Sequence, residues 1–149
     1  MELLFYHLTE DPLERALPTL VERSIAKGWR VVVQTGETER IGALSRLLWT
    51  YRPDSFLAHG HAGEGADHAA HQPIWLTDGE DDPNGARVRF LVERAAPGDL
   101  SGYERVVFLF DGHDAAALEQ ARAEWRARKG SAEMIYWKQT GTGGWEKAG

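Results

Sequence analysis

The sequence predicts one α/β domain in which helices cover both faces of a mostly parallel sheet. Short apolar runs alternate with segments whose apolar residues recur at helical spacing. The connections between these segments are short, and Val31-Val32-Val33 is a continuous β-branched run, typical of a strand buried on both faces. A strand, a helix and a second buried strand in succession predict parallel pairing through a right-handed crossover. The expected result is a single three-layer domain.

The composition is that of an ordinary globular protein. Of its 149 residues, 42% are hydrophobic and 27% are charged, and no apolar run approaches the length of a membrane span. The first residues begin directly as a strand and lack the basic region of a signal peptide. Cysteine is absent, which excludes disulfides and thiol catalysis and fits a cytoplasmic protein. The net charge of −6 disfavours autonomous binding to a nucleic-acid backbone.

The first predicted strand, residues 2–8, leads into a helix. Asp11 and Pro12 indicate the helix start, with a capping carboxylate and a proline in the first turn. Pro18 interrupts the helical pattern, so the helix either begins there or kinks there. Gly28 is suited to end the helix, because glycine readily adopts the left-handed backbone that follows a last turn.

The middle of the chain predicts a second helix and several short strands. The helix runs from about residue 37 to 49, and residues 60–72, rich in glycine, alanine and histidine, predict a loop. The acidic stretch 78–85 predicts the tip of a hairpin, and residues 87–92 alternate charged and apolar side chains, as in a strand with one wet face. The other strands expected in this part are 30–34, 55–58 and 73–77.

The last third predicts a further strand–helix–strand unit. Asp114 is placed to cap the helix, and Gly130 is placed to end it. The three elements are a strand at 105–110, a helix at 115–129 and a strand at 133–138. Residues 1–140 are therefore expected to form the single domain, and the glycine-rich residues 141–149 a flexible C-terminal tail.

The predicted fold often binds a nucleotide, but the required glycine loop is missing. The first strand leads into a segment without glycine that carries Glu10 and Asp11, which would repel phosphate. The glycines between 60 and 65 do not open a helix and are accompanied by Glu64. The sequence thus predicts an α/β fold without a phosphate loop, since the fold alone does not imply the function.

Four histidines are clustered in the predicted loop. His59, His61, His68 and His71 surround two carboxylates, and together these groups could bind zinc or an iron-type ion. A metal-dependent hydrolase using the His59–His71 loop is therefore the alternative function. A solvated loop with incidental histidines is favoured over it, because glycine and alanine hold ligands poorly and no helical His-Glu-x-x-His frame is present.

Serine-hydrolase chemistry has little support in the sequence. None of the serines lies in a Gly-x-Ser-x-Gly turn. Asp111 and Asp114 flank His113 at the carboxyl end of a predicted strand, where α/β active sites form. Capping of the next helix by Asp114 is the favoured interpretation.

The last predicted helix carries a cationic stripe. Arg122, Trp125, Arg126 and Lys129 are spaced so that they share one helix face. Guanidinium groups bind carboxylates in a bidentate fashion, and an aromatic ring supplies an apolar wall, so the stripe suits an acidic peptide with an aromatic end. Cations that complement the helix dipole, around a tryptophan in the core, explain the spacing equally well.

The most specific pattern in the chain surrounds the end of the second helix. Leu48-Trp49 is followed by Ser55-Phe56 and then by His59. Further segments occur in order: Phe5-Tyr6, Gly28-Trp29-Arg30-Val31, Gly63-Glu64-Gly65, Pro73-Ile74 and Ala121-Arg122 with Trp125-Arg126. Over almost its whole length the chain resembles the chi subunit of bacterial DNA polymerase III holoenzyme. The resemblance implies a nucleotide-binding-like fold and a non-catalytic replication protein with no cofactor and no metal.

The resemblance also implies two protein partners. The acidic C-terminal tail of single-stranded DNA-binding protein, which ends in phenylalanine, would bind the stripe of the last helix, to which Lys129 is added from its spacing. The psi subunit, or an equivalent subunit of the clamp-loader complex, would bind Leu48, Trp49, Pro53, Phe56 and His59. The hypothesis is a monomeric adaptor that contacts DNA only indirectly. The glycine-rich extension after Trp137 is longer than the family leads one to expect.

Overall fold

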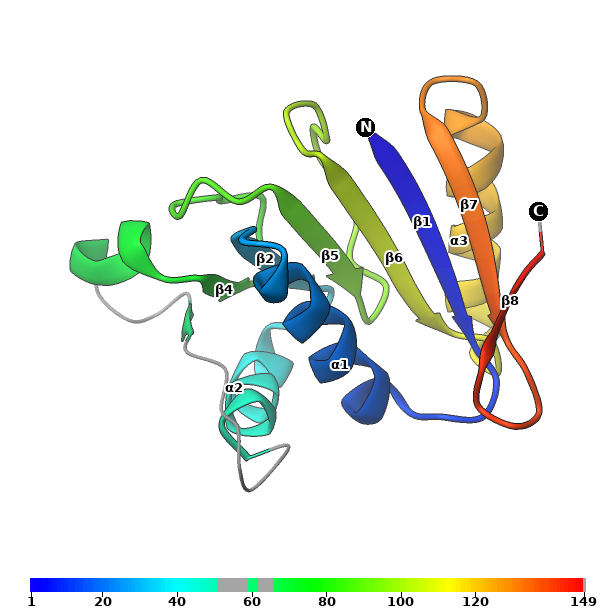
Figure 1. Ribbon diagram of the computed structural model, residues 1–149, viewed down its shortest axis with the longest axis horizontal. Coiled ribbons are helices and arrows are strands. Elements are labelled where there is room, and N and C mark those ends of the chain that lie inside the picture. The colour runs from blue at the N-terminus through cyan, green and yellow to red at the C-terminus, as the bar shows by residue number, and fades with distance from the viewer. Residues whose placement is uncertain (51–58, 62–65, 149) are drawn as a thin grey trace.

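A single sheet of eight strands organises the molecule (Figure 1). The computed structural model describes residues 1–50, 59–61 and 66–148. The strand order is β3-β4-β2-β5-β6-β1-β7-β8, and every neighbouring pair is parallel except β7 with β8. The strands are β1 (Glu2–Leu8), β2 (Val31–Thr35), β3 (Gly60–His61), β4 (Ile74–Thr77), β5 (Val88–Val92), β6 (Arg105–Asp111), β7 (Glu133–Gln139) and β8 (Trp145–Lys147).

The helices lie on both faces of this sheet, as the sequence predicted. The α-helices are α1 (Leu13–Ala26), α2 (Ile41–Thr50) and α3 (Ala115–Arg128), with 3-10 turns at Thr38–Arg40 and Ala66–His71. Helices α1 and α2 cover one face, and α3 lies behind β7 and β1 on the other (Figure 1). Side chains alternate between the faces, so Leu4 packs with α1 whereas Leu3 and Phe5 pack with α3. The mostly parallel α/β architecture is confirmed.

Helix α1 begins before Pro18 and continues through it. Pro12 is the N-cap residue and makes no side-chain capping bond, so the predicted cap by Asp11 is wrong. The Asp11 carboxylate instead accepts a hydrogen bond from Gln139 Nε2 at 2.8 Å. Pro18 is buried inside the helix, and Gly28, with φ of +84°, follows its end as predicted.

The predicted hairpin around residues 78–85 is wrong. Strands β4 and β5 do not pair with each other, because each lies parallel to β2 on opposite sides of it. The connecting segment is held instead by Asp81, which accepts hydrogen bonds from Trp75 Nε1 at 2.8 Å and from Thr77 Oγ1. An acidic turn between two strands therefore marks a parallel crossover here, which strand spacing alone does not distinguish from a hairpin.

Strand β5 has no wet face. That expectation rested on Arg87 and Arg89. Arg87 is exposed but precedes the strand, and Arg89 within the strand is only 3% exposed. Its guanidinium donates to Gln34 Oε1 at 2.8 Å, to the carbonyl oxygens of Gly79 and Asp81, and to the Tyr103 hydroxyl. These acceptors replace water around the buried cation, so an arginine is accommodated in a fully buried strand.

The histidine-rich segment is more regular than a loop. Gly60–His61 forms β3 along β4, and Ala66–His71 forms a 3-10 turn, in place of the predicted irregular segment. The strand predicted at 55–58 lies outside the described residues. No helix in the described part of the chain is long and apolar enough to cross a membrane.

Part of the expected tail belongs to the sheet. Trp145–Lys147 forms β8, antiparallel to β7, and the segment 141–149 therefore contains a strand that the sequence did not predict. The Trp145 ring lies edge-on to Tyr6 with 5.1 Å between ring centroids. Pairing with the exposed edge of β7 satisfies backbone groups of both segments, which explains why so short and polar a piece is ordered.

Candidate protein-binding sites

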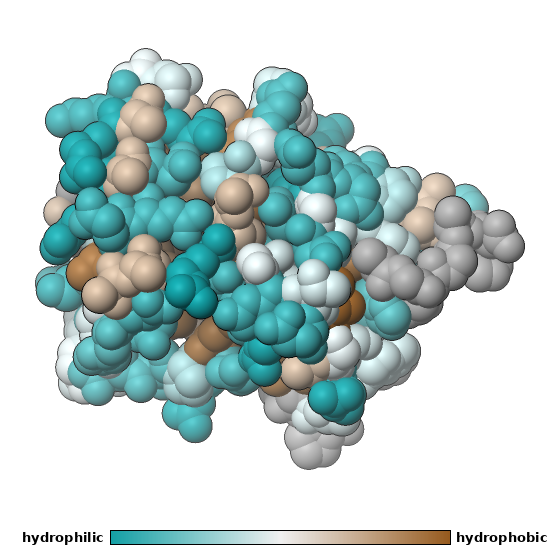
Figure 2. All heavy atoms as spheres, turned by 180° about the vertical axis from the view of Figure 1, so that it is seen from behind, coloured by the Kyte–Doolittle hydropathy of each residue, from teal (hydrophilic) through white to brown (hydrophobic). Residues whose placement is uncertain are grey.

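Helix α3 presents the cationic stripe above the β7 edge of the sheet. The Asp114 carboxylate caps the helix by accepting from the backbone N–H groups of Ala116 and Ala117, which confirms the predicted cap. Ala117 and Ala121 are buried against the sheet, which leaves the neighbouring face of the helix outward. Figure 2 shows this side of the molecule, where hydrophilic side chains dominate and hydrophobic ones lie between them.

Three residues of the stripe line one pocket. A cavity of about 280 Å³ is bordered by Arg122, Trp125, Arg126, Tyr136 and Ala148. Lys129 is the C-cap residue of α3, is exposed, and is not among the lining residues. The structure thus brings three of the four predicted tail-binding residues together.

The aromatic walls of this pocket are fixed by edge-to-face contacts. The Trp125 ring lies 5.2 Å from Phe5 and 5.7 Å from Tyr136 between ring centroids, at interplanar angles of 70° and 79°. Phe5 is fully buried and stacks on Phe108 at 4.6 Å. Trp125 is therefore both a core residue and a pocket wall, because one edge of its indole contacts the core while the residue stays half-buried.

The pocket is electrostatically positive. Arg122 and Arg126 are exposed, and Arg126 has Glu119 at 3.8 Å, whereas Arg122 forms no ion pair with any described residue. Burial raises the pKa of the Tyr136 hydroxyl, and the charge of Arg122 opposes that rise. The Tyr136 hydroxyl lies 2.8 Å from His7 Nδ1, and burial lowers the pKa of His7, with Lys138 and Arg122 adding to the effect. This field favours an anion over a second cation.

Two lining residues have no signature in the sequence. Tyr136 comes from β7, and Ala148 follows β8, so neither shares a helical spacing with Arg122. The sequence shows that Tyr136 is an aromatic residue of a strand. It does not show that this strand lies beside β1 and under α3, which is what brings Tyr136 to the pocket.

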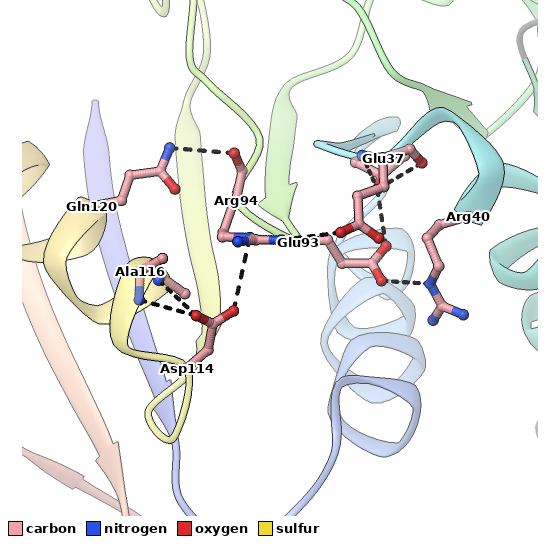
Figure 3. Close-up of polar contacts among 9 residues, drawn as sticks. Glu37, Arg40, Glu93, Arg94, Asp114, Ala116 and Gln120 are labelled. Atoms are coloured by element: carbon pink, nitrogen blue, oxygen red, sulfur yellow. Dashed lines mark hydrogen bonds and ion pairs between the residues drawn. The ribbon is translucent and has the colours of Figure 1, made fainter.

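A larger crevice lies at the carboxyl ends of the parallel strands, where this architecture usually binds ligands. Its volume is about 490 Å³. Figure 3 shows Arg94 between Glu37, at 3.1 Å, and Asp114, at 3.8 Å, while Arg40 Nε holds Glu93 Oε2 at 2.6 Å. Its lining carboxylates are Glu10, Asp11, Glu14, Glu37, Glu93, Asp111 and Asp114. Such a lining repels phosphate, in agreement with the missing glycine loop.

The side chains of Asp111, His113 and Asp114 make hydrogen bonds to backbone groups. His113 Nε2 lies 2.7 Å from the Thr9 carbonyl oxygen, and Asp111 Oδ1 accepts from the His113 backbone N–H at 2.9 Å. Asp114 caps α3. The three side chains are thus engaged in joining the ends of β1 and β6 to the helix.

The histidine cluster is only partly described. His59 is 7% exposed, and its Nε2 lies 2.8 Å from Ser45 Oγ. Within residues 1–50, 59–61 and 66–148, no group of three or more histidine or carboxylate side chains is arranged to hold a metal ion. Glu64 lies outside that part of the chain, and the side chains of Asp67 and His68 are not described.

The predicted partner-subunit interface is divided between surface and core. Trp49, at the end of α2, is 49% exposed, and its ring lies 4.9 Å from that of the buried His59. Leu48 is fully buried and faces the sheet rather than solvent, and its place in a partner interface stays a prediction. Pro53 and Phe56 lie outside the described residues.

The fold and its sites define an α/β domain with nucleotide-binding-like architecture, an acidic crevice and a separate cationic pocket. The family model described as DNA polymerase III chi subunit, HolC, matches residues 1–133. The chain therefore belongs to the DNA polymerase III chi subunit family, which confirms the resemblance seen in the sequence. This family consists of accessory, non-catalytic subunits of the polymerase III assembly, and gives the alternative of a metal-dependent hydrolase no support.

One curated relative is similar over part of the chain. The probable DNA polymerase III subunit chi of Rickettsia prowazekii (strain Madrid E) is 28% identical over 96 residues. That stretch covers 64% of this chain and 55% of the relative, so the chain spans about half the length of the relative it matches.

Proposed function

We propose that this protein is a replisome adaptor that binds the acidic C-terminal tail of single-stranded DNA-binding protein and links it to the clamp loader. The observation that carries the proposal is the α3 pocket, in which two exposed arginines stand beside a fixed aromatic wall. Membership of the chi family supports a replisome role.

The chemistry of the pocket matches that of the tail. Arg122 and Arg126 offer planar donors that pair with carboxylates, and Arg122 is engaged by no acid of the described chain. Trp125 and Tyr136 offer an apolar wall to the ring of a terminal phenylalanine. A cationic pocket on a protein of net charge −6 also favours a compact anionic peptide over a long nucleic-acid backbone.

The second contact is assigned to the surface around Trp49. A tryptophan that is half exposed beside a buried histidine ring has the character of an interface hot spot. This surface lies at the end of α2, on the opposite face of the sheet from α3, so both partners can bind at once (Figure 1). The psi subunit, or its equivalent in the clamp-loader complex, is the proposed occupant.

The test of tail binding is a calorimetric titration with a synthetic acidic peptide that ends in Pro-Phe. We expect saturable one-to-one binding, and we expect Arg122→Glu to remove it while leaving the thermal unfolding midpoint unchanged. Arg15→Glu is the matched control, because Arg15 is a 76% exposed cation on α1, on the other side of the sheet. No binding to the unmodified protein at low salt, or equal loss with both variants, would contradict the assignment.

A further inference from the structure

The pocket on α3 is closed on one side by a part of the chain that the family match does not reach. The match ends at residue 133, whereas β8 and Ala148 lie beyond it. Ala148 nevertheless lines the pocket together with the arginines and aromatic residues of the proposed tail site. The segment Trp145–Ala148, here called the C-terminal wall, thus contributes to the pocket from beyond the matched residues.

The C-terminal wall is held in place by backbone pairing with β7 and by the packing of Trp145 on the α1 side of the sheet. Lys147 and Glu146 pair with Trp137 and Lys138 of β7, and the Ala148 backbone N–H donates to the Tyr136 carbonyl oxygen at 2.8 Å. Alternate residues of a strand point to opposite faces, and Trp145 packs on the α1 side against Tyr6. Lys147 therefore shares the α1 side, and Glu146 and Ala148 share the α3 side with the pocket.

We infer that the C-terminal wall determines which apolar side chain the pocket accepts, with Ala148 setting its size; this rests on the proposed function. Ala148, whose side chain is a single methyl group, lines the pocket of about 280 Å³ together with Trp125 and Tyr136. The wall brings no cation to the lining, so the carboxylates of the peptide go to Arg122 and Arg126 and its apolar end goes toward Ala148. A larger residue at position 148 fills the space that the ring needs.

The experiment is a two-by-two titration of the full chain. The protein and its Ala148→Leu variant are each titrated with the acidic peptide ending in phenylalanine and with the same peptide ending in alanine. We expect Ala148→Leu to weaken binding of the phenylalanine peptide about tenfold or more, as for the loss of one buried apolar group, and to change binding of the alanine peptide far less. Ala70→Leu is the control, because Ala70 is an exposed alanine in the 3-10 turn Ala66–His71, near the opposite edge of the sheet from β8; it leaves both affinities unchanged.

The outcomes separate this inference from the function it rests on. If the unmodified protein binds neither peptide, the proposed function fails and the inference fails with it. If the phenylalanine peptide binds and Arg122→Glu removes it, but Ala148→Leu acts equally on both peptides or on neither, the tail site stands and the wall does not determine specificity.

A second measurement needs no substitution in the wall. With alanine methyl groups labelled with ¹³C in the unmodified protein, the resonance of Ala148 is expected to shift on saturation with the phenylalanine peptide, because an aromatic ring comes to lie over it. The alanine peptide produces a much smaller shift. An Ala148 resonance that both peptides leave in place overturns the inference, even if the leucine variant fails to fold.

Discussion

At the scale of the residue, Arg89 shows how a charge is kept inside this sheet. It is 3% exposed and donates to side-chain and backbone acceptors on three surrounding segments, including Gln34 on β2 and Tyr103 before β6. The Tyr103 hydroxyl in turn donates to Asp82 at 2.9 Å. Arg89 therefore fastens the acidic 78–85 crossover to the middle of the sheet.

We expect Arg89→Met to lower the free energy of unfolding by about 3 kcal/mol. Methionine fills much of the space, but it leaves buried acceptors unpaired, and each such group costs about 1–3 kcal/mol. Arg87→Met is the control: Arg87 is a 61% exposed partner of Glu104, and such surface pairs contribute at most about 1 kcal/mol. Equal midpoints for the two variants in urea unfolding would show that the buried network contributes nothing.

At the scale of the element, α3 links the stability of the domain to the geometry of the pocket. Its N-terminus is fixed by the Asp114 cap beside the acidic crevice, and Asp114 also lies 3.8 Å from Arg94. Because α3 is one continuous helix, fixing its N-terminus also helps to position Arg122 and Trp125 at the pocket. The two sites are therefore opposite ends of one helix, one serving stability and the other facing outward.

Asp114→Ala is expected to destabilise the protein by about 1 kcal/mol, because two backbone donors of the first turn lose their acceptor. Peptide affinity should change little, since the pocket lies at the other end of the helix. Glu119→Ala, an exposed change on the same helix, should alter stability by less than about 0.5 kcal/mol. Chemical denaturation followed by tryptophan fluorescence measures both effects, and a larger loss for Glu119→Ala would contradict the capping role.

At the scale of the whole molecule, the local charge of the pocket is opposite in sign to the net charge of the protein. The chain carries a net charge of −6, and the crevice at the carboxyl ends of the strands is lined with carboxylates. The cationic pocket is formed instead by α3 together with Tyr136 of β7 and Ala148 after β8. On the proposed function, this distribution disfavours contact with DNA over most of the surface and leaves one small site for a short acidic peptide.

Binding of the acidic peptide is expected to weaken as salt rises from 50 to 500 mM, because exposed charge pairs are screened at these concentrations. Single-stranded DNA alone should not bind the protein at about 150 mM salt, since the acidic surface offers few contacts for counterion release. Fluorescence anisotropy with labelled peptide and labelled oligonucleotide measures both. Tight binding of the bare oligonucleotide would contradict the adaptor proposal.

The sequence by itself determined the architecture and the stripe on the last helix. Strand and helix periods are local, so Val31-Val32-Val33 indicated a buried strand, and the spacing of Arg122, Trp125 and Arg126 placed them on one face before any fold was known. Asp114 was predictable for the same reason, because a helix cap depends on its nearest neighbours along the chain.

Only the tertiary structure decided which distant segments meet. The insertion of β2 between β4 and β5 turned an expected hairpin into a crossover and buried Arg89. The same long-range pairing brought Tyr136 and Ala148 to the stripe, and packing against the sheet buried Leu48 beside the exposed Trp49. These outcomes depend on the order of strands in the sheet. The strand order follows from how the apolar faces of the strands and helices are buried together. No periodic pattern along the sequence encodes that order.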